Sequence, residues 1–439
     1  MRVAIVGSGI SGLAAAHALA GRAQVTLYEA GAWFGGHTHT VDVTLPTPQG
    51  PVTHGVDTGF LVFNERTYPR LIELFAILGV KTVKSDMSFS VQVPDAFRGR
   101  PLEWSGASLN TVFAQRANLG RIRFLRMLRD LLRFNRLATA RAQSGEEAGL
   151  LQPLGEFLLE HRFSDEFRDW YLLPMIGCIW SCPTDEMLRF PVATLVRFCH
   201  NHGLLQVADR PQWWTVAGGA RTYVDKIIAG IADKRLNTPV RRVMRGAGGA
   251  RVSTDGGTEH FDHVVMATHP DQALSILADV SAQELEVLGA IRYQRNRAVL
   301  HTDTSVMPRN RSAWAAWNYE SGPAGGGQVC LHYWLNQLQP LPWTQPVLVS
   351  LNPVRPISRN QIMGEYDYEH PVFDRAAIAA QASVAQVQGQ RRTWFCGAWT
   401  GYGFHEDGLK AGQRVGLTLL NYAHAQQDIP AEAGVEALA

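Results

Sequence analysis

The chain has 439 residues, of which 46% are hydrophobic and 18% are charged, and its formal net charge is +2. This length predicts two or three domains, and the composition excludes a disordered or fibrous protein. Because the charge is nearly balanced, no global electrostatic field favours nucleic acid, and no nucleic-acid partner is predicted.

The N-terminal residues predict a complete β-α-β unit. Residues 2–6 are a β-branched run typical of a buried parallel strand, and a glycine-rich turn with the pattern GxGxxG follows directly. An alanine-rich helix is expected at 13–20 and a second strand at 24–28, which ends at Glu29. Such an order of strand, glycine turn, helix, strand and acid is typical of a dinucleotide-binding site.

Each glycine of the turn has its own expected role. Gly7 permits the tight turn, Gly9 lets the backbone approach a pyrophosphate, and Gly12 allows the helix to pack closely on the strand. The helix N-terminus presents free N–H groups to the phosphates, and the Glu29 carboxylate can accept hydrogen bonds from ribose hydroxyls. The alternative interpretation is an ordinary glycine-rich loop in an α/β sheet.

The segment after this acid carries a family resemblance. Residues 30–38, with the sequence AGAWFGGHT, contain the pair Gly35 and Gly36 shortly after Glu29. Here the chain resembles the large flavoprotein superfamily of amine oxidases, phytoene desaturases and protoporphyrinogen oxidases. Members of that superfamily carry such a Gly-Gly extension close to the flavin phosphates and the ribityl chain. The resemblance therefore implies FAD as the cofactor.

Three later stretches agree with this resemblance. The first is residues 54–63, the second is the pair of runs 237–243 and 261–268, and the third is residues 393–412. The first resembles the family's Asp-x-Gly segment near the isoalloxazine ring, the second the return of the sheet beside adenine, and the third the C-terminal flavin motif. In that motif a helix N-terminus points at the flavin N1 and C2 carbonyl. The cofactor-binding residues that the resemblance implies are Gly7, Gly9, Ile10, Ser11, Gly12, Glu29, Ala30, Gly35, Gly36, His37, Thr38, Gly59, Phe60, Val240, Ala267, Thr268, Gly397, Asp407, Gly408 and Leu409.

The resemblance also implies the fold class, which is α/β. We expect a Rossmann-type, glutathione reductase-like FAD-binding domain with an inserted α+β substrate domain of mixed sheet plus helices. The expected boundaries are 1–90, 205–270 and 390–425 for the discontinuous FAD domain, 91–204 (helical) and 271–389 (sheet) for the substrate domain, and 426–439 for a C-terminal tail.

No second dinucleotide motif is predicted. The glycine-rich run at 246–249 is interpreted as a hairpin turn and the one at 324–327 as a loop. Without a separate NAD(P)H domain, electrons taken from a substrate are expected to leave to oxygen, a quinone or another protein.

A basic amphipathic helix is expected at 120–141. Arg126, Arg129, Arg133 and Arg136 share one stripe, and the residues assigned to the opposite face are Phe124, Met127, Leu128, Leu131, Leu132 and Phe134. A peripheral contact with anionic lipid or with an acidic acyl-carrier protein is one interpretation. An ordinary surface helix with a solvated arginine face is the other.

The two insertions are expected to supply a hydrophobic substrate site. An apolar stretch at 170–183, broken by Pro174 and Gly177, predicts a cavity wall or plain core. Cys178 and Cys182 are expected to be small buried hydrophobes, with a redox pair as the alternative. The candidate substrate residues are Trp180, Ser181, Trp317, Tyr319, His332, Tyr333 and Phe404.

Departures from the family pattern bear on the reaction. Amine oxidases commonly place a lysine near flavin N5, but this chain has no lysine between 234 and 410, which weakens amine oxidation. The family's usual acid in the C-terminal motif is replaced by Trp399. His37 follows the Gly-Gly pair, where a hydrogen-bonding role is expected and covalent attachment of flavin is the alternative.

The segment 402–408 holds the candidate catalytic residues, namely His405, Glu406 and Tyr402. Glu406 or Asp407 is expected to cap the helix that follows, whereas His405 lies one step outside the cap and could move a proton near the flavin. A purely structural role for His405 is the alternative. Tyr402 and Phe404 are expected to flank the ring.

The five cysteines form no CxxC pair and no zinc spacing, so we expect reduced thiols, no metal site and a cytoplasmic protein, at most peripheral to the inner membrane surface. The chain begins directly with a strand, so no signal peptide is expected, and its longest near-apolar run is too short to span a bilayer. A monomer or homodimer is expected.

The motif set resembles a bacterial subgroup of predicted NAD/FAD-binding proteins associated with fatty-acid modification. It implies an FAD-dependent oxidoreductase that desaturates a hydrophobic acyl-lipid substrate by hydride transfer to flavin N5. The alternatives are a flavin-dependent double-bond isomerase of unsaturated fatty acids, an amine oxidase, and a protein whose flavin is only structural.

Overall fold

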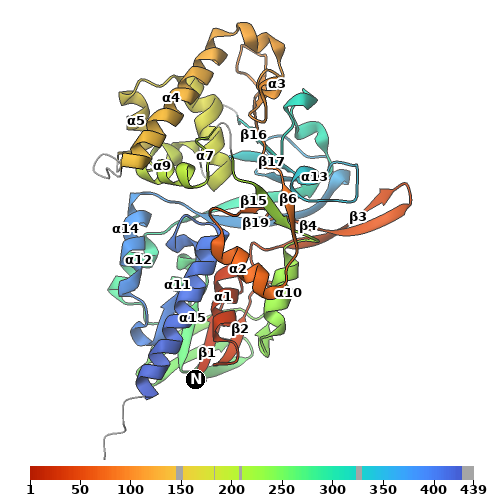
Figure 1. Cartoon of the computed structure of the whole chain (residues 1–439). Coiled ribbons are helices and arrows are strands. Elements are labelled where there is room, and N and C mark those ends of the chain that lie inside the picture. The colour runs from red at the N-terminus through yellow and green to blue at the C-terminus, as the bar shows by residue number, and fades with distance from the viewer. Residues whose placement is uncertain (145–151, 182, 207–209, 323–328, 428–439) are drawn as a thin grey trace, which may run out of the picture. The chain divides into compact units, whose positions relative to one another are not determined.

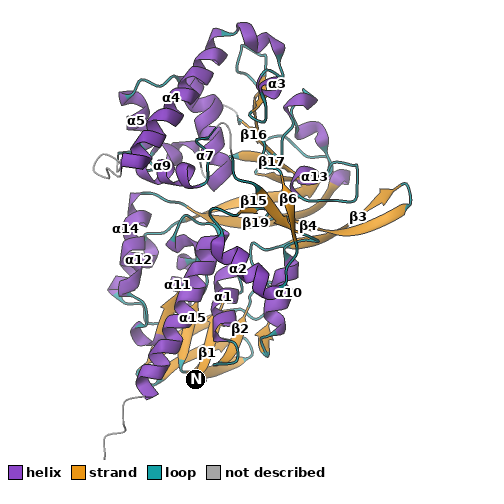
Figure 2. Ribbon diagram, in the orientation of Figure 1, coloured by secondary structure: helices purple, strands orange, loops and turns teal. Residues whose placement is uncertain are grey.

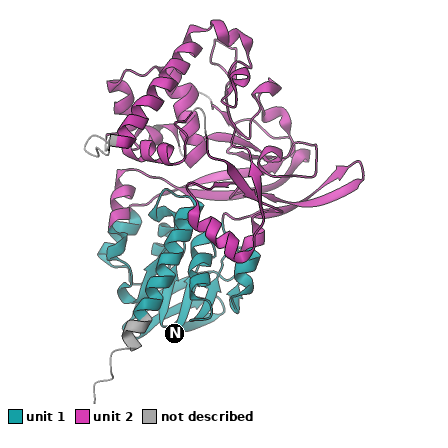
Figure 3. Ribbon diagram, in the orientation of Figure 1, with its two compact units in different colours: residues 1–36, 224–289, 383–439 teal, residues 37–223, 290–382 magenta. Residues whose placement is uncertain are grey.

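The computed structural model describes residues 1–144, 152–181, 183–206, 210–322 and 329–427 (Figure 1). The chain divides into two compact units (Figure 3). Unit 1 comprises residues 1–36, 224–289 and 383–439, and unit 2 comprises residues 37–223 and 290–382. The segment 37–90, which we expected in the FAD domain, groups with unit 2. None of the helices in the described part of the chain is both long and apolar enough to cross a membrane.

Unit 1 is built on a five-stranded parallel sheet. Its strands in spatial order are β10 (Asp233–Arg235), β2 (Gln24–Tyr28), β1 (Arg2–Val6), β14 (His263–Met266) and β20 (Thr393–Phe395). The expected β-α-β unit is confirmed, with α1 at Ile10–Leu19 between β1 and β2. Apolar β-branched side chains fill β1, which is buried on both faces as parallel strands usually are.

Helices and a β-meander pack around this sheet. α1 contacts β1 and β2, and α15 (His405–Gln427) lies along α1 (Figure 2). The meander, whose strands β12 and β13 contact β14 and β1, consists of β11 (Val240–Gly246), β12 (Gly249–Thr254) and β13 (Gly257–Phe261). Gly246 pairs with Gly249 across the predicted hairpin turn, which is confirmed. Two further helices are α11 (Pro270–Ile276) and α12 (Ala282–Gly289).

Three glycines one turn apart bring α15 onto α1. A Cβ on Gly412 would lie 2.0 Å from the Ser11 carbonyl oxygen, and one on Gly408 would lie 2.7 Å from Ile10 Cγ2. Gly416 repeats the pattern against Ala18 at 2.7 Å. The backbones of the two helices therefore approach more closely than any larger side chain allows.

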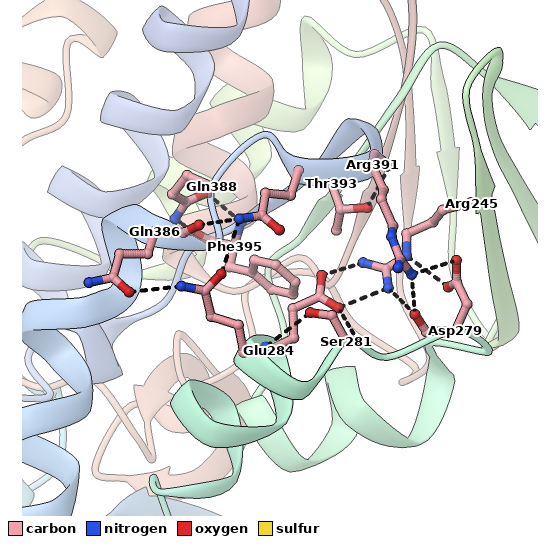
Figure 4. Close-up of polar contacts among 11 residues, drawn as sticks. Arg245, Asp279, Ser281, Glu284, Gln386, Gln388, Arg391, Thr393 and Phe395 are labelled. Carbon is pink, nitrogen blue, oxygen red and sulfur yellow. Dashed lines mark hydrogen bonds and ion pairs between the residues drawn. The ribbon is translucent and has the colours of Figure 1, made fainter.

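Side chains hold the edge strand β20, which leads into the C-terminal segment (Figure 4). The Gln388 amide donates to the Phe395 carbonyl (2.7 Å) and accepts from the Phe395 N–H (2.9 Å), so it pairs the edge as a neighbouring strand would. Nearby, Arg245 of the meander is fully buried and binds Glu284 and Asp279 of the α12 region. The bonds of Gln388 hold the end of β20, from which the loop at residues 396–404 begins.

Unit 2 is built on a mixed seven-stranded sheet. Its strands in spatial order are β19 (Ile362–Pro371), β15 (Tyr293–His301), β18 (Leu348–Leu351), β17 (Cys330–Trp334), β16 (Trp317–Glu320), β7 (Phe89–Val93) and β8 (Leu102–Ser105). Neighbouring strands are antiparallel except β16 and β7, which are parallel. The smaller strands are β3 (Thr40–Thr47) with β4 (Gly50–Asp57), and β5 (Phe63–Asn64), β9 (Trp213–Val216) and β6 (Thr82–Ser85).

The expected helical insertion forms a cluster of helices. They are α3 (Leu109–Val112), α4 (Ile122–Ser144), α5 (Leu154–Glu160), α6 (Asp165–Phe167), α7 (Leu173–Trp180), α8 (Thr184–Leu188) and α9 (Val192–Asn201). The remaining helices are α2 (Pro69–Leu78), α10 (Arg221–Ala229), α13 (Leu335–Leu338) and α14 (Arg375–Ser383). We expected Gly177 to break the apolar stretch, but it lies inside α7. A Cβ at this position would come within 2.9 Å of Val329.

Candidate flavin site and substrate sheet

The glycine turn after β1 keeps one position open. Gly7 has a φ of +102°, and a Cβ there would lie 2.6 Å from the carbonyl oxygen of Ala267, next to Thr268. A Cβ on Gly12 would lie 2.0 Å from the Gly7 carbonyl oxygen, so this glycine is required by packing. A Cβ on Gly9 would meet no atom of the described chain within 4 Å. The described chain therefore leaves open space over Gly9, in contrast to Gly7 and Gly12 of the same turn.

The open position faces the N-terminus of α1. Gly9 is the N-cap residue and has no side chain to accept from the first N–H groups of the helix, which begins with Ile10, Ser11 and Gly12. Free N–H groups and the positive end of the helix dipole bind anions, and a pyrophosphate is such an anion.

Glu29 ends β2 beside this turn. Its Oε2 accepts from the backbone N–H of Ser8 (3.0 Å) and from the Ser8 hydroxyl, and its Oε1 accepts from the N–H of Gly31 (2.8 Å). A carboxylate oxygen can accept two hydrogen bonds, so Oε1 keeps a lone pair for a ribose hydroxyl. The protein donors fix the carboxylate in the orientation that such a contact requires.

The Gly-Gly pair packs directly on the first turn. Gly35 and Gly36 have φ of +117° and +58°, which favour glycine, and the N–H of Gly35 donates to the Ser8 carbonyl (3.0 Å). A Cβ on Gly36 would lie 3.1 Å from Gly9 Cα. The segment that begins at Ala30 thus returns to the same side of the turn as the open position at Gly9.

The loop before β11 packs on the segment that follows Glu29. The N–H groups of Asn237 and Thr238 donate to the carbonyls of Gly31 (3.0 Å) and Glu29 (2.8 Å), and β11 then begins at Val240. A surface cavity of about 430 Å³ adjoins the loop, lined by Arg235, Asn237–Pro239 and Thr254–Glu259.

The C-terminal segment folds back through Asp407. The Oδ2 of Asp407 accepts from the N–H groups of Tyr402 (3.0 Å) and Phe404 (3.1 Å), so this acid shapes the loop before α15. Burial raises the pKa of Asp407 to about 6. Gly397, Gly408 and the fully buried Leu409 flank the loop, and the Trp399 ring lies over Gly397, where a Cβ would come within 2.2 Å of Nε1.

His405 and Glu406 differ from their expected places. His405 does not lie outside the helix but is its first residue, and burial lowers the pKa of its imidazole to about 3. Glu406 is buried and forms an ion pair with Lys410 one turn later (3.2 Å). At neutral pH the His405 imidazole is uncharged, and a group with so low a pKa is a weak proton acceptor.

The cofactor residues expected after the Gly-Gly pair come together within unit 2. The N–H of Phe60 donates to the carbonyl of His37 (2.8 Å), and a Cβ on Gly59 would lie 2.2 Å from that same oxygen. The hydroxyl of Thr38 bonds to that of Tyr223. The two segments therefore form one tightly packed strand-like pair.

Asp57, which precedes this pair, is held at the centre of a hydrogen-bonded network. Its carboxylate accepts from the N–H of Ala220 (2.9 and 3.0 Å), the Gln339 amide (2.6 Å) and the Thr40 hydroxyl (2.5 Å). Burial raises its pKa to about 6, although these donors oppose the shift. The network joins three parts of unit 2 that are far apart in the sequence.

One face of the sheet in unit 2 carries aromatic, uncharged side chains. Trp317 and Tyr333 are cross-strand partners whose ring centroids lie 4.8 Å apart, and Tyr319 faces Leu331 in the next pair. The hydroxyl of Tyr333 hydrogen-bonds to Ser181, the residue that follows α7. The structure therefore joins most of the expected substrate residues of the two insertions.

Trp180 and His332 lie elsewhere. The Trp180 ring packs on Phe198 (4.6 Å between centroids) and Phe190 inside the helical cluster. His332 points to the opposite face of the sheet from Tyr333, because side chains alternate along a strand. Phe404, the last expected substrate residue, belongs to unit 1.

The opposite face of the sheet holds a buried polar row. His332 Nε2 lies 3.1 Å from Glu320 Oε2, its Nδ1 lies 2.6 Å from the Ser350 hydroxyl, and Arg355 binds the other oxygen of Glu320 (2.7 Å). Burial alone would lower the pKa of His332, but Cys330 and Glu320 raise it to about 9.

Glu320, Cys330 and His332 are residue types that bind metals, and their ligand atoms lie within 4.8 Å of one another. A metal cation would here stand beside the guanidinium of Arg355, which already neutralises Glu320. The ion pairs therefore account for the cluster without a metal. The described cysteines Cys178, Cys199, Cys330 and Cys396 are free and buried, and Cys182 lies outside the described residues.

The sequence matches one known family over most of its length. The family of flavin-containing amine oxidoreductases matches residues 10–307. The chain belongs to this family. Its cofactor is FAD, and the structure has the Rossmann-type α/β fold that the motifs predicted.

Individual relatives of this flavin enzyme are distant. A protein of Mycobacterium tuberculosis named as a flavin-containing monoamine oxidase, AofH, is 25% identical over 283 residues, which are 63% of this chain and 59% of the relative. Among solved structures, cyclohexylamine oxidase from Brevibacterium oxydans has a TM-score of 0.65 at 18% identity, covering 96% of this chain and 99% of that one. A CLA-producing fatty acid isomerase from P. acnes has a TM-score of 0.64 at 17% identity, covering 95% and 98%.

The residues of unit 1 fit FAD. The space at Gly9, the uncapped start of α1 and the oriented carboxylate of Glu29 match a pyrophosphate and a ribose in that order. When bound, FAD supplies a two-electron acceptor. Sequence reasoning singled out the Asp-x-Gly segment that begins at Asp57 but missed the hydrogen-bonded network of this acid. It also missed the glycine row of α15, although the spacing of Gly408, Gly412 and Gly416 at intervals of four was a visible signal of close helix packing.

Proposed function

We propose that this flavin enzyme dehydrogenates a hydrophobic acyl-lipid substrate. A hydride would leave one carbon for flavin N5, a proton would leave the neighbouring carbon for a base, and a C=C bond would form. Dioxygen or a quinone would then take the two electrons from the reduced flavin. The reaction is balanced with FAD as the only bound oxidant.

The observation that carries this proposal is the uncharged aromatic face of the sheet in unit 2. On this face Trp317 and Tyr333 are partly buried and Tyr319 and Leu331 are buried, while the charged side chains of the same strands point to the other face and are paired. A surface of this kind suits an acyl chain, because apolar pockets with few polar groups bind apolar ligands.

The alternatives have support of their own. The likeness in sequence to AofH favours an amine substrate, yet β15, like the whole chain between 234 and 410, contains no lysine. The isomerase has the same fold, and a double-bond isomerisation with no net redox change would also suit an acyl chain.

One experiment separates these reactions. The purified FAD-loaded protein is titrated anaerobically with a bacterial lipid extract and, separately, with putrescine and cyclohexylamine, while the oxidised-flavin absorbance is followed. We expect bleaching by lipid and a lipid product lighter by two hydrogens. Bleaching by amines alone would overturn the proposal, and a lipid product of unchanged mass with a shifted double bond would assign the isomerase reaction.

The role of His405 is tested in the same assay. If His405 accepts the proton, His405→Ala slows flavin reduction by the bleaching substrate at least a hundredfold while FAD stays bound. The matched control is His260→Ala, at an exposed site on β13 of the same unit. Unchanged reduction kinetics in His405→Ala would fit the low pKa of this imidazole and remove it from the mechanism.

A further inference from the structure

The solvent-exposed face of α4 is not the arginine stripe that the sequence predicted. Ile122, Leu125 and Leu132 are 74%, 41% and 45% exposed, and they share this face with Arg126, Arg129 and Arg136. Leu132 had been expected on the buried side. We call these six residues the apolar–arginine face.

The core does not need these apolar side chains. The buried side of α4 is formed by Phe124, Met127 and Phe134, which are almost fully buried in the helical cluster. Half of the large hydrophobic side chains that are exposed in the described chain lie between residues 109 and 159. Three of them, Ile122, Leu125 and Leu132, share one face of α4, and exposed apolar side chains gathered on one face indicate an interaction surface.

The same surface carries excess positive charge. The segment 116–141 contains eight arginines and one acid, Asp130. Asp130 and Glu166 pair with arginines of α4, but both acids are almost fully buried. The side chain of Arg129, in contrast, is 72% exposed. The solvent-exposed side chains of this face are therefore basic or apolar, while the acids that partly neutralise the arginines are buried.

We propose that the apolar–arginine face binds the surface of an anionic lipid bilayer. Side chains such as Ile122 and Leu125 would enter the boundary between headgroups and acyl chains, and the guanidinium groups would pair with lipid phosphates. Mixed apolar and basic residues on one helix face match this interface in both polarity and charge. The proposal goes beyond the reaction and does not depend on which substrate the enzyme takes.

Vesicle co-sedimentation tests the proposal with the FAD-loaded protein. We expect it to sediment with vesicles of equal phosphatidylglycerol and phosphatidylcholine, to bind phosphatidylcholine vesicles far less, and to dissociate at high salt. The double variant Arg129→Gln/Arg136→Gln should lower the partition coefficient about 30-fold, at about fivefold for each arginine. Ile122→Gln/Leu125→Gln should lower it at least tenfold on both kinds of vesicle.

Matched variants place the same changes on other helices. Ile77→Gln/Leu285→Gln replaces side chains that are 67% and 59% exposed, and Arg70→Gln/Arg189→Gln removes two exposed arginines. Both controls should bind vesicles as the unaltered protein does. Because the readout is binding, failure of the proposed reaction leaves this result unaffected.

Three outcomes would overturn the proposal. Absence of sedimentation with the anionic vesicles would do so, and binding to a purified acyl-carrier protein under those conditions would assign the face to that partner instead. Equal loss of binding in the variants and their controls would place the contact elsewhere. Retained flavin absorbance in each variant shows that the fold is intact.

Discussion

Replacing Gly9 by alanine tests whether this glycine is required for FAD binding or for the stability of the protein itself. Gly9 has φ −61° and ψ 176°, which alanine adopts freely, and the added Cβ would meet no atom of the described chain within 4 Å. The folded protein without FAD should therefore accept Gly9→Ala. The loss of chain flexibility should even raise the free energy of unfolding by about 0.4–1 kcal/mol.

The cofactor should not accept the same methyl group. If the pyrophosphate occupies the space over Gly9, the methyl group forces it from the N-terminus of α1. Overfilling a close-packed site by one methyl group costs about 1–3 kcal/mol. The dissociation constant of FAD should accordingly rise about 5- to 150-fold, as measured by titrating the deflavinated protein and following the quenching of flavin fluorescence.

Gly12→Ala is the matched control in the same turn. Its Cβ would lie 2.0 Å from the Gly7 carbonyl oxygen, a contact that the backbone must move to relieve. This variant should lose thermal stability even without FAD, whereas Gly9→Ala should not. If Gly9→Ala bound FAD as tightly as the unaltered protein, the open space at Gly9 would not be the pyrophosphate site.

Two further predictions concern packing and pH. Gly412→Ala, whose Cβ would lie 2.0 Å from the Ser11 oxygen, should lower the free energy of unfolding by about 1–3 kcal/mol, while Gly248→Ala, which meets no described atom within 4 Å, should not lower it in thermal unfolding. Because burial raises the pKa of Asp57 from 3.8 to about 6, its contribution to stability is complete below pH 4 and is lost as the pH rises through 6, by about 3 kcal/mol. Urea unfolding between pH 4 and pH 7 should show this fall, and a curve for Asp57→Asn with the same slope would contradict it.

The parts of the molecule that the sequence predicted well are those with short-range causes. The glycine turn, α1 and Glu29 lie within 30 residues of one another, and a Cβ on Gly7 or Gly12 would clash with a neighbouring backbone oxygen. The same holds for the hairpin at 246–249, whose two glycines pair directly. At such turns the local backbone geometry restricts the residue types so strongly that the geometry can be predicted from a single sequence.

Contacts between distant segments escaped prediction for a physical reason. Asp57 accepts from Ala220, 163 positions along the chain, and no periodicity marks that partner. On α4 the helical period was correct, but Leu132 lies near the edge of the buried face. Which side of such an edge becomes exposed depends on the neighbouring helices. A helical wheel contains no information about them.

The two functions of the chain are encoded in different ways. The groups that fit FAD in unit 1 are mainly backbone groups, so glycines at fixed spacings in this chain mark the site. The proposed substrate site consists of side chains on a sheet, where a shift of one residue reverses the face, as the neighbours His332 and Tyr333 show. His332, Glu320 and Arg355 gather the charge of these strands on one face and neutralise it there. The other face can therefore remain uncharged, which is the feature on which the proposed acyl-chain substrate rests.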